Sequence, residues 1–136
     1  MAHELFDTCV IFDYLGLNGP AHQQRVSPHV RAVLDGPRTA SITPLTPLEL
    51  LQGKGKGLNK TEMLAAFVMV RALEEAPVTL DAGRQAGEWL AGKTKGECRE
   101  LTADALIAAT ASTRGEPVRT INVKHFRQFY NKVLTY

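Results

Sequence analysis

The pattern of apolar and polar residues along this chain predicts short strands that alternate with helices. Residues 4–15, ELFDTCVIFDYL, contain a short apolar strand that turns directly into a helix. Asp7 and Thr8 stand at that junction, where their side-chain oxygens suit a helix N-cap. A second strand is predicted within residues 38–45, and Pro44 marks its end because proline donates no hydrogen bond to a sheet.

Two helices are predicted next, and the first carries a clear start signal. Thr46 is placed as an N-cap, Pro47 at the first helical position and Glu49 three residues after the cap, which is a capping-box arrangement. Residues 60–76 have apolar side chains at helical spacing, and we expect this helix to bury a broad face. The apolar positions are Met63, Leu64, Phe67, Val68, Val70 and Leu73.

The second half of the chain continues the alternation. Residues 77–80, PVTL, predict a strand, and Asp81 is expected to cap the helix that follows it. Residues 92–100 are predicted to form a polar turn before residues 101–111, LTADALIAATA, an almost wholly apolar helix. Asp104 would then be an ionisable group in the first turn of a helix otherwise suited to the interior.

The remaining segments complete a single α/β domain. Residues 117–121 and 132–136 predict strands on either side of a helical turn at residues 123–129. Strands separated by helices imply a mainly parallel sheet covered on both faces. A length of 136 residues suits one domain, residues 1–136.

Composition indicates the cellular compartment of the protein but not its function. A formal net charge of +2 permits a polyanionic partner without pointing to one. Cys9 and Cys98 form no zinc-binding or disulfide pattern, so a reduced, cytoplasmic protein is expected. The apolar run LAAFVMV is far shorter than the roughly 20 residues that span a bilayer, and no signal peptide precedes residue 8, so we expect no membrane association.

Three carboxylates are predicted to meet at the carboxyl edge of the sheet, where parallel α/β folds bind ligands. Asp7 ends the first strand, Glu49 belongs to the helix after the second, and Asp104 opens a later helix. Each alone is explained as a cap or as a favourable charge at a helix end. Together they would raise one another's pKa unless a cation compensates, and carboxylate ligands suit Mg²⁺ or Mn²⁺. Such ions catalyse phosphodiester hydrolysis.

The order of these residues resembles that of the PIN-domain nucleases, specifically the VapC toxins of toxin–antitoxin pairs. The similar segments are LFDTCVIFDYL, SITPLTPLELLQG and LTADALIAATASTRGEPVRTINVKHF, and the match runs nearly from end to end. The resemblance implies a three-layer α/β/α sandwich with a mainly parallel sheet of order 3-2-1-4-5. It also implies a homodimer, a Mg²⁺ or Mn²⁺ cofactor, RNA as substrate, and a VapB-like antitoxin as partner.

The resemblance also assigns site residues. Asp7, Glu49 and Asp104 would hold the metal ion and Asn122 would assist catalysis. The family usually has a fourth acid at the position of Asn122 or of His125, and neither is acidic here. Cys9 stands where the family usually has asparagine or serine, which leaves a polar contact to the first acid missing. Weaker candidates for contact with the substrate are Thr8, His125, Lys124, Lys54 and Lys56.

Three other functions are possible: a PIN-fold protein that binds without cutting, a DNA nuclease and a nucleotide-hydrolysing enzyme. The missing fourth acid favours a PIN-fold protein that binds RNA or a partner without cutting. A structure-specific DNA nuclease could use the same carboxylates. The segment GKGKGLNKT approaches the phosphate-binding pattern GxxxxGK[ST], but Asn59 stands where the second glycine is required, and a solvated loop explains it better.

Overall fold

The computed structural model describes residues 3–52 and 57–136 as an α/β sandwich. The helices and strands, in chain order, are β1 (His3–Phe6), α1 (Thr8–Tyr14), α2 (Pro20–Leu34), β2 (Thr39–Ile42), α3 (Leu45–Gln52), α4 (Lys60–Arg71), β3 (Glu74–Glu75), α5 (Leu80–Leu90), α6 (Lys95–Arg114), β4 (Val118–Arg119), α7 (Val123–Arg127) and β5 (Val133–Leu134).

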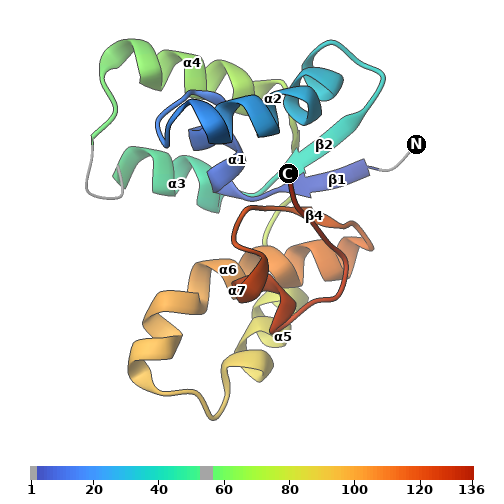
Figure 1. The fold of residues 1–136 in the computed structure, drawn as a ribbon. Coiled ribbons are helices and arrows are strands. Elements are labelled where there is room, and N and C mark those ends of the chain that lie inside the picture. The colour runs from blue at the N-terminus through green and yellow to red at the C-terminus, as the bar shows by residue number, and fades with distance from the viewer. Residues whose placement is uncertain (1–2, 53–56) are drawn as a thin grey trace.

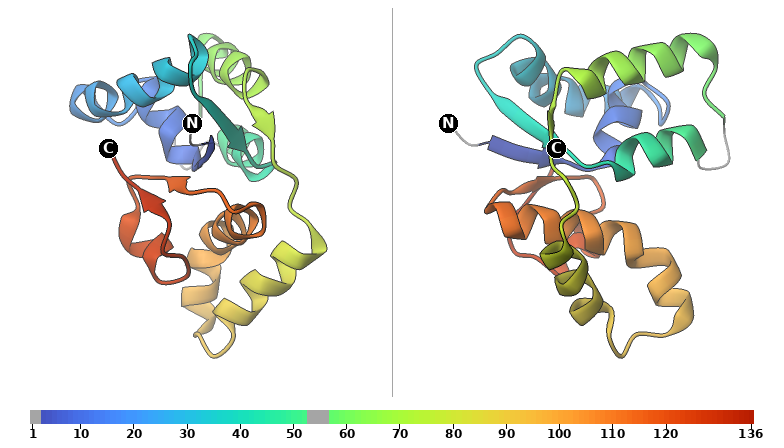
Figure 2. Two further views of the ribbon diagram at one scale, coloured as in Figure 1. Left: turned by 90° about the vertical axis from the view of Figure 1, so that its right-hand side faces the viewer. Right: turned by 180° about the vertical axis from the view of Figure 1, so that it is seen from behind.

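The five strands form one parallel sheet in the order β3-β2-β1-β4-β5. Helices α1 to α4 lie on one side of the sheet and α5 to α7 on the other, so the molecule has three layers (Figures 1 and 2). The predicted fold class is therefore confirmed: a three-layer α/β/α PIN-like sandwich with strand order 3-2-1-4-5. Among the described residues, no helix is both long enough and apolar enough to cross a bilayer.

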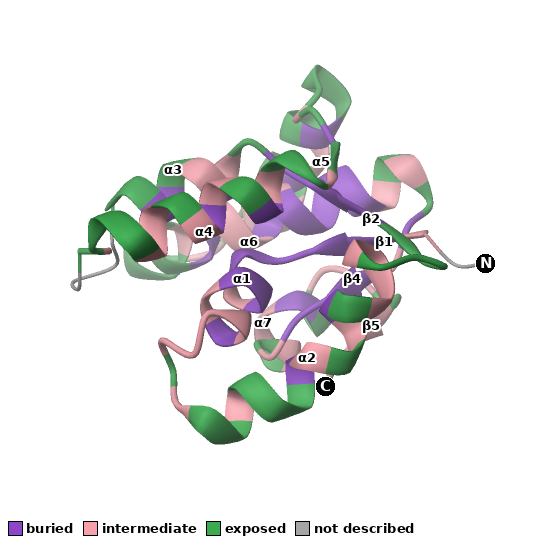
Figure 3. Cartoon of the chain, turned by 90° about the horizontal axis from the view of Figure 1, so that it is seen from above, coloured by how far each residue is buried: buried purple, intermediate pink, exposed green. Residues whose placement is uncertain are grey.

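Strand β1 separates two hydrophobic cores because successive side chains of a strand point to opposite faces. Phe6 packs with Val10 and Ile11 in the core beneath α1 to α4. Leu5 packs with Ile107, among others, in the core on the side of α6 and α7. Seen from above, the buried residues follow β1 and the inner faces of the helices (Figure 3). These cores fix the sheet from which the site is built.

The strand register brings three chain segments together at the carboxyl edge of the sheet. Phe6 pairs with Ile42 of β2 on one side and with Arg119 of β4 on the other. The residues that follow these positions, Asp7 and Thr120 among them, therefore leave the sheet side by side. The backbone N–H of Asp7 donates to the carbonyl of Arg119 at 3.1 Å, which extends this pairing by one residue.

Helix α6 begins earlier than predicted, which changes the place of Asp104. Thr94 and Glu97 form a reciprocal capping box, so residues 95–100, which were expected to belong to a polar turn, are the start of a 20-residue helix. Asp104 lies near the middle of α6 rather than in its first turn. The prediction was wrong because the apolar pattern of residues 101–111 hid a polar, exposed start that is capped by its own side chains.

Two further helix starts differ from prediction. Helix α3 begins at Leu45, so Thr46 is a helical residue rather than its N-cap. Thr79 caps α5 and Asp81 lies in the first turn, so residues 77–80 contribute no strand, and the strand of this region is β3 at Glu74–Glu75. In both places a threonine earlier than expected, Thr43 or Thr79, bonds the free backbone N–H groups.

Helix α4 does not bury the broad face that its spacing predicted. Asn59 and Glu62 form its capping box at the predicted start, but the helix ends at Arg71 rather than at residue 76, and Glu74–Glu75 form β3 instead. However, Leu64 and Val68 remain 68% and 62% exposed. The fold places one helix stripe on the core and leaves the adjoining apolar stripe in solvent, which the spacing of apolar residues alone does not reveal.

Candidate functional site

Asp7 lies at the centre of the site and is held by both of its neighbouring elements. It is the N-cap of α1, and its Oδ1 accepts a 2.8 Å hydrogen bond from the backbone N–H of Thr8. Its Oδ2 accepts a 2.7 Å hydrogen bond from the hydroxyl of Thr120, which follows β4. The side chain is almost completely buried. The carboxylate is therefore fixed between α1 and the adjacent strand.

Electrostatics show that the other two predicted acids lie near Asp7. The pKa of Asp7 is raised to about 6, first by burial, then by the negative charge of Asp104 and more weakly by that of Glu49, against hydrogen bonds from Thr120 and Cys9 that lower it. The negative charges of Asp104 and Glu49 therefore both act on the Asp7 carboxyl. The fold thus brings together three acids that the sequence separates by up to 97 positions, the distance from Asp7 to Asp104.

Glu49 is anchored by Thr8 on the neighbouring helix. The Thr8 hydroxyl donates a 2.9 Å hydrogen bond to Oε1 of Glu49 and lies 2.8 Å from the hydroxyl of Thr46. Since the single proton of Thr8 goes to the carboxylate, Thr46 is the donor of the second bond. Thr8 is fully buried, so it positions Glu49 instead of contacting the substrate as the sequence suggested.

Asp104 is paired with His125 across the boundary between α6 and α7. Nδ1 of His125 lies 2.9 Å from Oδ2 of Asp104, so Nδ1 carries the proton because a carboxylate only accepts. Nε2 of the same ring lies 3.8 Å from Oε1 of Glu100, one turn earlier on α6. The ring therefore orients Asp104 and holds α7 against α6, a role that the sequence did not predict for His125.

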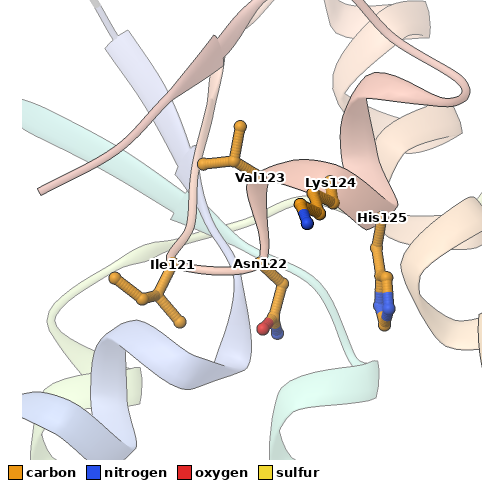
Figure 4. Close-up of a pocket in the computed structure, with 5 residues that line it drawn as sticks. All are labelled: Ile121, Asn122, Val123, Lys124 and His125. Carbon is orange, nitrogen blue, oxygen red and sulfur yellow. The ribbon is translucent and has the colours of Figure 1, made fainter.

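Asn122 lies at the rim of the site. It is exposed and precedes α7, and its backbone N–H donates to the Thr120 hydroxyl at 2.9 Å. Ile121, Asn122, Val123, Lys124 and His125 line an open pocket of about 340 Å³. In this pocket the Asn122 amide and the His125 ring point to the same side (Figure 4). The predicted residues Asn122, Lys124 and His125 thus share one surface, whereas Lys54 and Lys56 lie outside the described residues.

Thr120 and Cys9 are the site residues that sequence reasoning missed. Thr120 is fully buried and joins Asp7 to Asn122 through its one hydroxyl. The Cys9 thiol lies 3.3 Å from Oδ2 of Asp7, so the polar contact expected to be missing is present. Burial and the Asp7 charge raise the pKa of Cys9, which keeps it a protonated donor. The register of β1 with β4, in which Phe6 pairs with Arg119, places the next residues, Asp7 and Thr120, side by side, and no local sequence pattern gives that register.

The donor set suits a hard divalent cation, although its spacing does not enclose one. Within residues 3–52 and 57–136, no three histidine, cysteine or acidic side chains are close enough to ligate one ion together. Mg²⁺ usually binds one or two carboxylates directly and keeps several of its waters. Asp7 with a second acid would meet that requirement. A cation would stabilise the charged form of Asp7, which burial first and then the charges of Asp104 and Glu49 disfavour.

Several solved structures share this architecture, and toxin–antitoxin complexes are among them. VapBC2 from Rickettsia felis, bound to a promoter DNA fragment, is 16% identical over 100% of this chain and 98% of its own, with a TM-score of 0.64. A toxin–antitoxin complex from Klebsiella pneumoniae is 20% identical over 97% and 96%, with a TM-score of 0.68. FitAcB from Neisseria gonorrhoeae is 19% identical over 97% and 95%, with a TM-score of 0.67.

This chain has the fold of those three solved structures. The coverage is nearly complete in both directions, so the whole chain corresponds to one whole chain of each complex. No protein-family model matches the chain, and no curated protein matches its sequence. At 16–20% identity, the likeness establishes the fold, and the chemistry has to be argued from the site itself.

Proposed function

We propose that this chain is a metal-dependent endoribonuclease of the VapC toxin type, which hydrolyses RNA phosphodiester bonds. The observation that carries the proposal is Asp7, a buried carboxylate whose pKa is raised to about 6 by its burial and by the charges of Asp104 and Glu49. A protein maintains such mutual repulsion at a functional site more readily than elsewhere. The fold shared with toxin–antitoxin complexes adds independent support.

In this proposal some residues would bind the metal ion, and others would orient the water molecule or the RNA. Asp7 would be the central ligand of Mg²⁺ or Mn²⁺, with Glu49 and Asp104 completing the site directly or through water. When bound, the ion would supply positive charge that activates a water molecule and stabilises the phosphoryl oxygens. Asn122 would place its amide against the water or the substrate, and Lys124 beside it would contact the RNA backbone.

The experiment uses purified chain free of antitoxin and a structured RNA, with Mg²⁺ or Mn²⁺ present. Cleavage that stops with EDTA and in Asp7→Asn supports the enzyme. An Asp81→Asn variant is the matched control, because Asp81 is an exposed acid on α5 away from the sheet edge. Cleavage of single-stranded or flapped DNA in preference to RNA would instead establish a DNA nuclease.

A second candidate function is a PIN-fold protein that binds RNA or a partner without cutting. It is favoured by two observations: neither Asn122 nor His125 is acidic, and the described acids do not enclose a cation. Retention of RNA by the chain with no cleavage in either metal would establish this reading and exclude the first.

The proposed partner is a VapB-like antitoxin, and the proposed site of action is the cytoplasm. Several solved structures with this fold are complexes with an antitoxin. Helices α3 and α4, which pack together, carry solvent-exposed apolar side chains of the kind that an amphipathic helix covers. These side chains are Leu48, Leu51, Leu64 and Val68. A homodimer, also expected for such toxins, is tested by sedimentation of the purified chain.

The antitoxin surface is tested by Leu64→Glu, which should weaken binding of the co-expressed antitoxin and leave the fold intact. Leu80→Glu is the control, because Leu80 is 94% exposed at the start of a different helix, α5. Equal binding by both variants would assign the antitoxin to another surface.

A further inference from the structure

Cys9 and Tyr136 form a second layer behind Asp7 that neither the fold nor the expected acids account for. Cys9 lies in the first turn of α1, and Tyr136 follows β5 at the other end of the described chain. Their side chains meet, with the Tyr136 hydroxyl 3.6 Å from Sγ of Cys9. This contact joins residues 127 positions apart, and one of them, Cys9, also contacts the Asp7 carboxylate.

The hydrogen bonds show which acceptor receives the hydroxyl proton of Tyr136 and which receives the thiol proton of Cys9. The Tyr136 hydroxyl donates its single proton to Oδ2 of Asp13, a buried carboxylate on α1. Sγ of Cys9 accepts from the backbone N–H of Ile121 at 3.5 Å. The thiol proton is therefore left for Oδ2 of Asp7, 3.3 Å away, the same oxygen that Thr120 contacts.

Asp13 is itself held in place, so Tyr136 has a fixed anchor. The side-chain amide of Asn18 donates a 2.7 Å hydrogen bond to Oδ1 of Asp13. Nδ1 of His22, on α2, lies 3.7 Å from Oδ2 of Asp13. The Tyr136 ring is half-buried against the α1 to α4 core, as Cys9 is, and its hydroxyl contacts the sulfur of Cys9.

We infer that Cys9 is a positioning residue for Asp7, and that Tyr136, anchored on Asp13, holds the Cys9 thiol in place and shields it from solvent. This inference rests on the proposed function only for the role of Asp7. The shielding of Cys9 stands on geometry alone and is tested without any catalytic assay.

The first experiment measures how fast iodoacetamide alkylates Cys9 in the full chain, with peptide mass spectrometry separating Cys9 from Cys98. Tyr136→Ala should raise the Cys9 rate on the order of tenfold or more, the equivalent of one lost hydrogen bond to a charged group. Tyr136→Phe keeps the ring and loses the anchor, so its rate should be intermediate. Cys98, on α6, is the internal standard.

The matched control is Tyr130→Phe, which removes a 2.8 Å hydrogen bond to the Glu116 carbonyl far from Cys9. It should leave the Cys9 rate unchanged. Equal Cys9 rates in the wild type and Tyr136→Ala, in chains that melt at the same temperature, would overturn the shielding. If Tyr136→Ala does not fold, Tyr136→Phe alone decides the question.

The second experiment measures hydrogen exchange of the Thr8 amide, which reports the position of Asp7 because it donates to Oδ1. Cys9→Ala should accelerate this exchange and weaken Mn²⁺ binding, whereas Cys9→Ser, which keeps a donor, should restore both. Unchanged exchange in Cys9→Ala overturns the positioning role. A wild-type chain that binds no Mn²⁺ and cuts no RNA would remove the proposed function, yet both the exchange and alkylation measurements would remain valid tests.

Discussion

The hydroxyl of Thr120 donates a 2.7 Å hydrogen bond to Oδ2 of Asp7, although 113 positions separate the two residues in the chain. The parallel pairing of β1 with β4 brings them together, since each residue follows the last paired position of its strand. The same hydroxyl accepts the backbone N–H of Asn122. The Thr120 side chain therefore holds in place both the Asp7 carboxylate and the loop that begins at Asn122.

Thr120→Val should lower the free energy of unfolding by about 1–3 kcal/mol, because the buried Asp7 carboxylate loses one of its three donors while valine keeps the shape of threonine. It should also reduce RNA cleavage, since both Asp7 and the Asn122 loop lose their support. Urea unfolding measures the first effect. Thr120→Ser keeps the hydroxyl and should behave like the wild type, and a valine variant of equal stability and activity would contradict this role.

In metal-free buffer at neutral pH, the wild-type chain should be less stable than Asp7→Asn, in which the side chain has nearly the same shape but no charge. Its pKa is about 6 in the folded chain against an ordinary value of 3.8, so the folded state holds the proton more tightly. The resulting stabilisation is complete below about 3.8 and is lost as pH rises through 6. Asp7→Asn should therefore gain up to about 3 kcal/mol over the wild type at pH 8 and lose that advantage at pH 4.

Urea unfolding of the two chains with EDTA at several pH values measures this difference. Addition of Mn²⁺ at pH 8 should reverse the order, since only the carboxylate gains from the cation. A difference between the two chains that stays constant from pH 4 to pH 8 would mean that the Asp7 carboxyl is not strained by its surroundings.

Asp104→Asn should lower the pKa of Asp7 from about 6, because the Asp104 charge is the second-largest cause that raises it, after burial. The pKa stays above its ordinary value, since burial remains. The measurement is the pH at which the difference in stability between chains with Asp7 and chains with Asp7→Asn changes. It is made once with Asp104 present and once with Asp104→Asn. The exposed Asp81→Asn background should leave that pH unchanged, and an equal pH in all backgrounds would place Asp104 outside the site.

Arg119→Met should cost about 3–5 kcal/mol of stability, because it leaves the buried Glu4 carboxylate without its partner. Nη2 of Arg119 lies 2.8 Å from Oε2 of Glu4 and Nε lies 3.2 Å from Oε1, while Nη1 donates to the carbonyl of Thr135 at 2.7 Å. The pair therefore ties β1 to the segment after β5. Urea unfolding measures the loss.

Two companion variants make that measurement specific. Glu4→Leu combined with Arg119→Met removes both charges and should recover most of the loss. Arg84→Met breaks an exposed pair with Glu88 at 2.7 Å and should cost less than about 1 kcal/mol. A loss in Arg119→Met no larger than in Arg84→Met would show that the buried pair contributes nothing beyond a surface pair.

The structure changes the local context that the sequence predicted for two of the three acids. Asp7 at the end of a strand and the start of a helix was predictable, because the apolar run and the capping side chain are adjacent in the chain. Asp104 was assigned to a first turn and lies in mid-helix, because the preceding residues 95–100 are polar and give no apolar signal. Glu49 was predicted to cap its own helix, and its carboxylate accepts from Thr8 of another helix.

The sequence by itself determined the alternation of strands and helices, the parallel sheet and the position of Asp7 between a strand and a helix. These follow from periodicity and capping, which act over a few neighbouring residues. Only the tertiary structure decided that Thr120 and Cys9 donate to Asp7, that His125 orients Asp104 and that Tyr136 covers Cys9. Those contacts join residues from 2 to 127 positions apart, and their geometry depends on strand register and side-chain packing, which no local pattern encodes.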